Sequence, residues 1–144
     1  MSHVRQQLRE SVASAVTGLA LTGSRVFQSR VYPVQTTDLP CLVISTDGED
    51  VEYLTIRSPS QQVREVIVRI EATARANTDL DDTLDAICQQ VEIAIAGASL
   101  IAKSVQLSGT RIEINVLGDQ PIGQATLIYR MKVYTLSNEP QTAL

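Results

Sequence analysis

The chain has 144 residues, of which 44% are apolar and 3% aromatic, and its formal net charge is −4. This length is typical of a single domain that needs no metal or disulfide to hold its core, and the apolar content excludes wholesale disorder. The acidic balance and the scarcity of aromatic side chains argue against a protein that grips duplex phosphates or stacks bases.

The first predicted element is a helix over residues 3–20. Apolar residues recur at steps of three and four from Val4 to Leu19, a spacing typical of an amphipathic helix. Ser2 is the expected N-cap. The N-terminal residues are too polar for a secretory signal, and a later apolar helix carries too many acidic residues to span a membrane. We therefore expect a soluble protein that is made in the cytoplasm and contacts no membrane.

Three strands are expected next. A short strand over residues 25–32 is limited by Pro33, because proline cannot continue a sheet ladder. The continuous apolar run at 41–45 indicates a strand that is buried on both faces. An acidic turn with an Asp-Gly pair at 46–50 then separates this strand from a further one at 51–57.

The clearest unit is a strand followed by a helix. Apolar and polar residues alternate over 62–75, which predicts a strand with one buried face. A polar turn at 77–79 leads into a helix at 79–97 with one continuous apolar face. Thr78 or Asp79 is expected to cap this helix, and the acidic residues of its first turns complement the helix dipole.

Two strands near the C-terminal end, at 112–116 and 127–134, read as an antiparallel hairpin joined by the Gly- and Pro-containing segment 118–123. Residues 1–136 then form a single domain, and residues 137–144 are expected to be a flexible tail. The predicted order is α-β-β-β-β-α-β-β. This is an α+β fold, in which a mostly antiparallel mixed sheet carries two main helices on one face.

Reactive side chains are sparse. His3 is the only histidine and lies at the terminus, so no Ser-His-Asp set can be built around it. Cys41 and Cys88 each sit within an apolar pattern and are expected to be buried free thiols. The sequence contains no zinc-type cysteine spacing and no phosphate-binding glycine motif. It therefore predicts a protein without a catalytic residue, a cofactor or a metal. We expect that the protein is not an enzyme.

Charged residues are expected to form a contact surface instead. Acidic residues gather at the start of the 46–61 segment, and charges of both signs are expected on the strand faces opposite the apolar ones. Such a mixture suits a solvated face, a subunit interface or the wall of a pore. The candidate interface residues are Asp47, Glu49, Asp50, Glu52, Arg57, Arg64, Ile67, Arg69, Glu71, Arg130 and Lys132.

Local sequence and element order together indicate a family. The amphipathic helix Val4–Leu19 is followed by a proline-bearing segment, Arg30–Pro33, and by a loop with proline that enters an apolar strand, Asp38–Ile44. A long strand then feeds an amphipathic helix, and a hairpin ends the chain. Over residues 3–136 this arrangement resembles the tail terminator (minor tail protein U, tail completion) family of long-tailed bacteriophages.

The resemblance implies a hexameric ring in the virion, at the head-proximal end of the tail. Such a ring caps the tail tube, stops polymerisation of the tail tube protein and provides the surface that meets the head-tail connector protein. DNA passes through its bore without specific binding. The resemblance transfers no individual residue. We expect the loop 46–61 to reach the tail tube or the neighbouring subunit, so that deleting Asp47–Ser60 would abolish capping and leave a folded monomer.

Three alternatives stay open. A head-to-tail connector or neck protein shares the size, the ring and the α+β composition. A small-ligand-binding or enzymatic α+β domain would need a polar pocket with convergent groups. A cytosolic adaptor outside any phage is the third.

Overall fold

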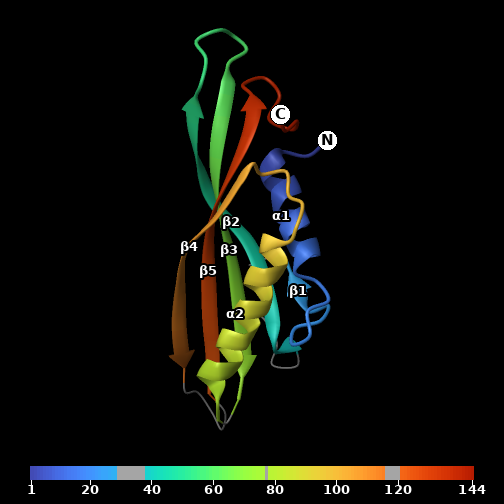
Figure 1. Ribbon diagram of the computed structural model, residues 1–144, viewed down its shortest axis with the longest axis vertical. Helices are drawn as coiled ribbons and strands as arrows, with labels where there is room; N and C mark the ends of the chain where they lie inside the picture. Colours follow the sequence, from blue (N-terminus) through green and yellow to red (C-terminus); the bar gives the residue numbers. More distant parts are fainter. Residues whose placement is uncertain (29–37, 77, 116–120) are drawn as a thin grey trace.

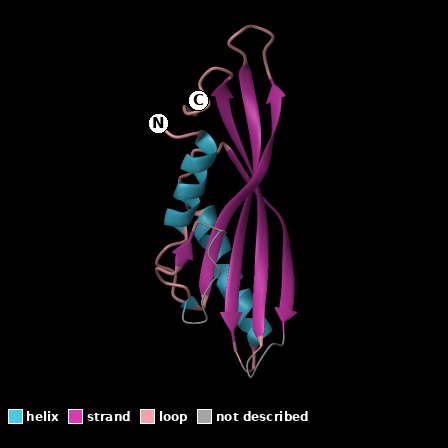
Figure 2. Cartoon of the chain, turned by 180° about the vertical axis from the view of Figure 1, so that it is seen from behind, coloured by secondary structure: helices cyan, strands magenta, loops and turns pink. Residues whose placement is uncertain are grey.

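The computed structural model describes residues 1–28, 38–76, 78–115 and 121–144. In this part of the chain, five strands form one sheet in the order β1-β2-β3-β5-β4. Helices α1 (Val4–Ala15) and α2 (Leu80–Ala96) pack on the same face of that sheet. Figure 1 shows both helices beside the strands, and Figure 2 views the sheet from the side opposite α2. The predicted α+β class with two helices on one face is confirmed.

The sheet is mixed but mostly antiparallel, also as predicted. Strand β1 (Val26–Phe27) is the single parallel neighbour and pairs with the beginning of β2 (Cys41–Tyr53). The central pair is β3 (Gln61–Arg75) and β5 (Ile122–Leu136), which are antiparallel over their whole length. Strand β4 (Ser104–Asn115) pairs with β5 and forms one edge.

The core lies between the helices and the sheet. The alternation in β3 puts Val66, Val68 and Ile70 on one face, and the register sets Ile70 beside Leu127 of β5. Helix α2 covers these two strands with a stripe of buried residues at helical spacing, and α1 covers β2 in the same way. Each fully buried aliphatic side chain of this kind contributes about 1.5–3 kcal/mol.

Strand β2 is longer than the sequence predicts. The segments 41–45 and 51–57, expected as two strands with a turn between them, belong to one strand that runs from Cys41 to Tyr53. The Asp-Gly pair forms a β-bulge there, with a register shift between Thr46 and Gly48, and Gly48 has φ 145°. A bulge inserts one residue and reverses the face that later side chains occupy. The predicted turn is therefore wrong, whereas complete burial of 41–45 is confirmed.

The bulge places Glu49 on the helix side of the sheet. Before it, Leu42 and Ile44 face the helices, opposite Ala72 and Ile70 of β3. After it, Glu49 pairs with Val66 and joins the same face.

Beyond the bulge, β2 and β3 form a hairpin closed by residues 54–60. The Leu54 N–H donates to the Gln61 carbonyl at 2.8 Å. Figure 1 shows this hairpin extending past the start of α1, at the end of the molecule opposite the start of α2.

Several predicted boundaries need correction. Helix α1 ends at Ala15 rather than near residue 20, and Gly18 follows in a turn with φ 89°. The N-cap is His3 rather than Ser2, because the His3 ring accepts a hydrogen bond from the Arg5 N–H. Asp79 occupies the N-cap position of α2, as predicted, but it adopts the left-handed conformation and its side chain makes no capping hydrogen bond.

Parts of some predictions lie outside the described residues. These are positions 29–37 of the expected strand and proline segment, position 77 of the expected turn, and positions 116–120 of the final connection. None of the described helices has the length and hydropathy that a membrane span requires.

The C-terminal segment 137–144 lies against the body of the domain. The Val4 N–H donates to the Pro140 carbonyl at 2.9 Å, and the Leu144 N–H donates to the Tyr134 carbonyl at 2.8 Å. Both figures show the two termini close together. Flexibility of this segment stays a prediction, and these hydrogen bonds do not favour it.

Candidate functional site

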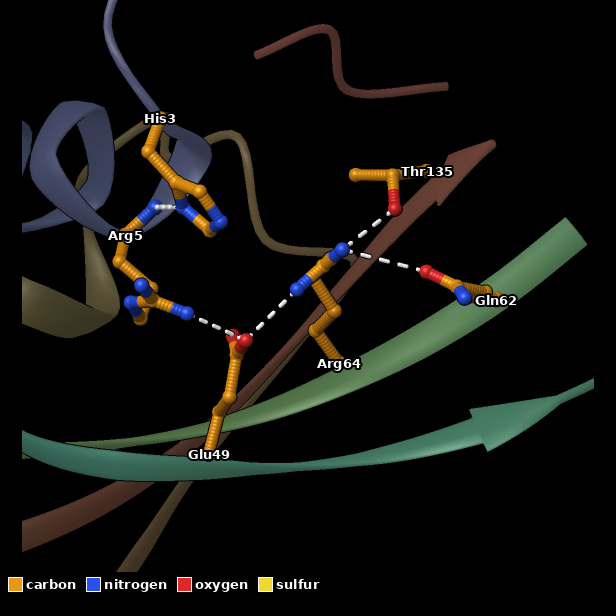
Figure 3. A network of polar contacts seen from close by, with 6 residues as sticks. All are labelled: His3, Arg5, Glu49, Gln62, Arg64 and Thr135. Carbon is orange, nitrogen blue, oxygen red and sulfur yellow. Dashed lines mark hydrogen bonds and ion pairs between the residues drawn. The ribbon is translucent and has the colours of Figure 1, made fainter. Parts of the chain in front are cut away.

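An ion network occupies the base of the hairpin, under the start of α1 (Figure 3). Arg64 of β3 donates from Nη1 to Glu49 Oε1 at 2.6 Å, and Arg5 of α1 forms an ion pair with the same oxygen. Arg64 also donates from Nε to Thr135 Oγ1 at 3.0 Å and from Nη2 to Gln62 Oε1 at 3.1 Å. One carboxylate therefore joins α1, β2 and β3, and Arg64 extends the network to β5.

The network is mostly buried. The side chains of Glu49 and Arg64 are each 10% exposed, whereas that of Arg5 is 40% exposed. His3 lies beside it, and burial, together with the positive charges of Arg5 and Arg64, lowers the pKa of the His3 imidazole. A neutral imidazole keeps the Nδ1 lone pair that caps α1. The network is suited to holding the hairpin at a fixed angle to α1.

Two predicted interface residues belong to this network. Glu49 and Arg64 pack inside the chain, on the face covered by the helices. Arg64 shares the face of Val66, two residues further along β3, rather than the opposite face expected for it. Their charges are matched within the chain, so neither is available to a neighbour without breaking the network.

Other predicted residues do lie on the uncovered face of the sheet. Among them, Arg130 has a side chain that is 48% exposed, and it forms an ion pair at 2.7 Å with Glu65, a residue outside the predicted set. Arg69 lies 3.0 Å from Asp47 and 3.6 Å from Glu71. Ile67, Asp50, Glu52 and Lys132 belong to the same face by their register. This face carries paired charges of both signs, each pair accessible to solvent, and such pairs typically contribute little to stability.

The end of the hairpin carries exposed apolar side chains. Ile56 is 103% exposed, Tyr53 66%, Leu54 48% and Val51 40%. Arg57, also exposed, follows directly. We call Tyr53–Arg57 the tip. Sequence reasoning selected the acidic residues of this segment and missed its apolar ones, although Tyr53-Leu54-Thr55-Ile56 contains three large apolar residues beside turn-forming Ser-Pro-Ser.

A second exposed apolar surface follows the opposite edge of the sheet. On the helix side of β4, Val105, Leu107, Ile112 and Ile114 are 36–46% exposed, and Ile93 of α2 is 65% exposed. Between them run open depressions, one of about 640 Å³ between Ile93 and Ile112 and one of about 440 Å³ between Ile95 and Leu107. We call this the α2–β4 groove. It exists because α2 packs over β3 and β5 and leaves β4 uncovered.

The described residues offer little reactive chemistry. No group of three or more His, Cys, Asp or Glu side chains among them could hold a metal ion. Cys41 and Cys88 are buried free thiols, as predicted, and burial raises the pKa of each thiol to about 11. Burial, with the nearby charge of Glu92, raises the pKa of Tyr129 to about 12. All three groups are neutral at physiological pH.

Comparison with known proteins finds a likeness among solved structures. No protein-family model matches the chain, and no curated protein matches it. Among solved structures, it is similar to a chain from the "Virion of native gene transfer agent (GTA) particle". The two share 22% sequence identity, the match covers 92% of each chain, and the TM-score is 0.44. At these values we draw no functional argument from the likeness.

Proposed function

We propose that this protein is a structural component of a phage-type virion, a tail terminator that closes into a ring on the tail tube. The ring stops polymerisation of the tube protein and presents the surface that meets the head-tail connector. The resemblance of residues 3–136 to that family motivates the proposal. It does not rest on the structural neighbour.

One observation of the structure carries the proposal, namely the exposed apolar tip. Large apolar side chains gathered on a projecting hairpin mark an interaction site, because transferring them from water into an interface lowers the free energy. The buried network at the hairpin base resists movement of that hairpin relative to α1. A rigid arm with an apolar end is suited to a permanent contact in an assembly.

The arrangement of surfaces also suits a cyclic assembly. A ring built from one chain type uses two different patches, each meeting the other on the neighbouring copy. The tip and the α2–β4 groove are two such patches on separate parts of the chain. A hexamer and a bore that passes DNA without specific binding belong to this proposal, and the net charge of −4 fits a conduit that does not retain DNA.

Electron microscopy of particles that lack this protein tests the proposal. A terminator predicts tails longer than normal, because nothing stops the tube protein from adding. Unjoined heads beside tails of normal length would instead indicate a connector and would contradict the terminator role.

A point variant probes the tip without disturbing the fold. Removal of Asp47–Ser60, the change that the sequence suggests, would delete half of β2 together with Glu49 and would destroy the ion network. Ile56→Asp changes a fully exposed side chain instead, and we expect it to give overlong tails. The matched control is Thr55→Asp, which adds the same charge in the same loop. Its carboxylate can still accept the Gln61 N–H bond that Thr55 accepts at 2.9 Å.

A further inference from the structure

The tip and the α2–β4 groove have matching chemistry. Both are apolar at their centres. The rim of the groove is acidic, because α2 carries four acidic residues and no basic one: Asp81, Asp82, Asp85 and Glu92. The tip carries one charged residue, Arg57, and that residue is basic. Apolar contact flanked by opposite charges is the usual composition of a specific interface.

Ile93 and Ile56 are the most exposed large apolar side chains of the two surfaces. Ile93 of α2 lines one depression together with Ile112 and Thr110 of β4, and Asp85 and Glu92 line the same depression. A single inserted aliphatic side chain would contact both Ile93 and Ile112. Arg57, next to it on the tip, would then face the acidic side of α2.

The contact must join two copies. In Figure 1 the tip lies at one end of the molecule, while α2 and the lower part of β4 lie toward the other end. The hairpin continues strands β2 and β3 of the sheet, and the Arg5–Glu49–Arg64 network ties its base to α1, so it points away from its own groove. A tip on one copy and a groove on the next give a heterologous contact, which repeats around a ring.

We propose that the tip of each subunit docks in the α2–β4 groove of its neighbour, with Ile56 entering beside Ile93 and Arg57 facing the acidic rim. The proposal deepens the ring function proposed above and rests on it. It assigns the hairpin to contact between subunits rather than to contact with the tube.

Two single variants and their mixture test this pairing. Ile56→Asp damages the tip and leaves the groove intact, whereas Ile93→Asp damages the groove and leaves the tip intact. Both positions are exposed. An unchanged circular dichroism spectrum, and unchanged urea unfolding at a concentration where the wild-type chain is monomeric, therefore establish that each variant folds. Ile56→Leu and Ile93→Leu serve as controls that keep an apolar side chain at the same place.

Native mass spectrometry then reports the assembly. Each Asp variant alone is expected to be monomeric at concentrations where the wild-type chain and the Leu controls form the ring, with association weakened at least about 100-fold. An equimolar mixture is expected to stop at dimers, because the tip of the Ile93→Asp chain can enter the groove of the Ile56→Asp chain and no further contact is possible. Assembly of either Asp variant like the wild-type chain would overturn the pairing.

Cross-linking gives an independent readout of the same contact. A mixture of Ile56→Cys and Ile93→Cys chains, treated with a short bismaleimide, is expected to yield a cross-link between residues 56 and 93 of different copies. The native thiols are buried and serve as an internal control. Absence of that cross-link in assembled rings would overturn the proposal.

The outcomes separate this inference from the proposed function. If both Asp variants form the same ring as the wild-type chain, the tip-to-groove contact is refuted and the terminator role stands. If the Ile56→Asp variant forms the ring but fails to stop tube growth, the tip contacts the tube protein, and this result also refutes the tip-to-groove contact. A wild-type chain that never assembles, with or without tubes, refutes the ring itself.

Discussion

Replacement of Glu49 by Gln removes the only carboxylate in the network at the hairpin base. The amide keeps the shape of the side chain and can still accept one hydrogen bond from Arg64. It leaves the Arg64 guanidinium, 10% exposed, without a counter-charge. Arg5 loses its partner as well, but it is 40% exposed and water can compensate for the loss.

The expected cost follows from the burial of Arg64. Removing one partner of a buried ion pair costs about 3–5 kcal/mol. Arg64 keeps its hydrogen bonds to Gln62 and Thr135, so the lower end of that range applies. A loss of about 3 kcal/mol lowers the folding equilibrium constant by more than about 100-fold. With a urea dependence of about 1.5 kcal/mol per molar, the unfolding midpoint falls by about 2 M.

Urea unfolding, followed by circular dichroism at one protein concentration, measures this loss. The fixed concentration matters because assembly itself stabilises the folded chain. The matched control is Glu65→Gln, which breaks the exposed ion pair with Arg130 and should cost less than about 1 kcal/mol. Adding Arg64→Met to Glu49→Gln removes the uncompensated charge, but it also removes the hydrogen bonds that Arg64 donates to the buried Gln62 and Thr135 side chains, so it should recover only part of the loss. A Glu49→Gln variant as stable as the Glu65→Gln control would refute the reasoning.

Three further predictions concern other parts of the fold. Gly123→Ala should lower the free energy of unfolding by about 1–3 kcal/mol, because a Cβ atom there would lie 2.8 Å from the Leu84 side chain of α2. Gly109→Ala is the control: a Cβ atom there would meet open space, so the free energy of unfolding should change by less than about 1 kcal/mol in the same urea experiment. His3 has a lowered pKa in the folded chain, so its stabilising contribution is complete above the ordinary value of 6.5 and is lost as the pH falls below it. His3→Asn, which keeps a cap, should therefore flatten the stability profile between pH 7.5 and 5.5, and an unchanged slope would contradict this role. Cys41 and Cys88, with thiol pKa values of about 11, should react with a disulfide reagent at pH 8 roughly 100-fold or more slowly in the folded chain than in urea, where both should titrate as free thiols.

Sequence patterns predict the elements whose structure depends on local order. The strand-helix unit appears within one or two residues of its expected ends, as β3 and α2, because period-two and period-3.6 patterns continue through it without interruption. The buried thiols follow from the apolar runs around them. The class of fold follows from the sequence of these elements.

The features that shape the candidate site depend on pairing between distant residues. An Asp-Gly pair suits a turn and a bulge equally well, and only the pairing of β2 with β3 selects the bulge that turns Glu49 inward. The exposure of Ile112 in β4 depends on how much of the sheet α2 covers, which alternation alone does not specify. Arg64 is different. The alternation along β3 already places Arg64 on the face of Val66, so its position on the helix side of the sheet can be predicted from the sequence.

The central claim is that this chain closes into a ring, and native mass spectrometry over a concentration series tests it most directly. The account predicts a discrete species of six times the 15.7 kDa subunit mass. The same species should appear as a ring with a central hole by electron microscopy. A chain that stays monomeric at every concentration, and that also fails to form a ring on purified tail tubes, would contradict the account.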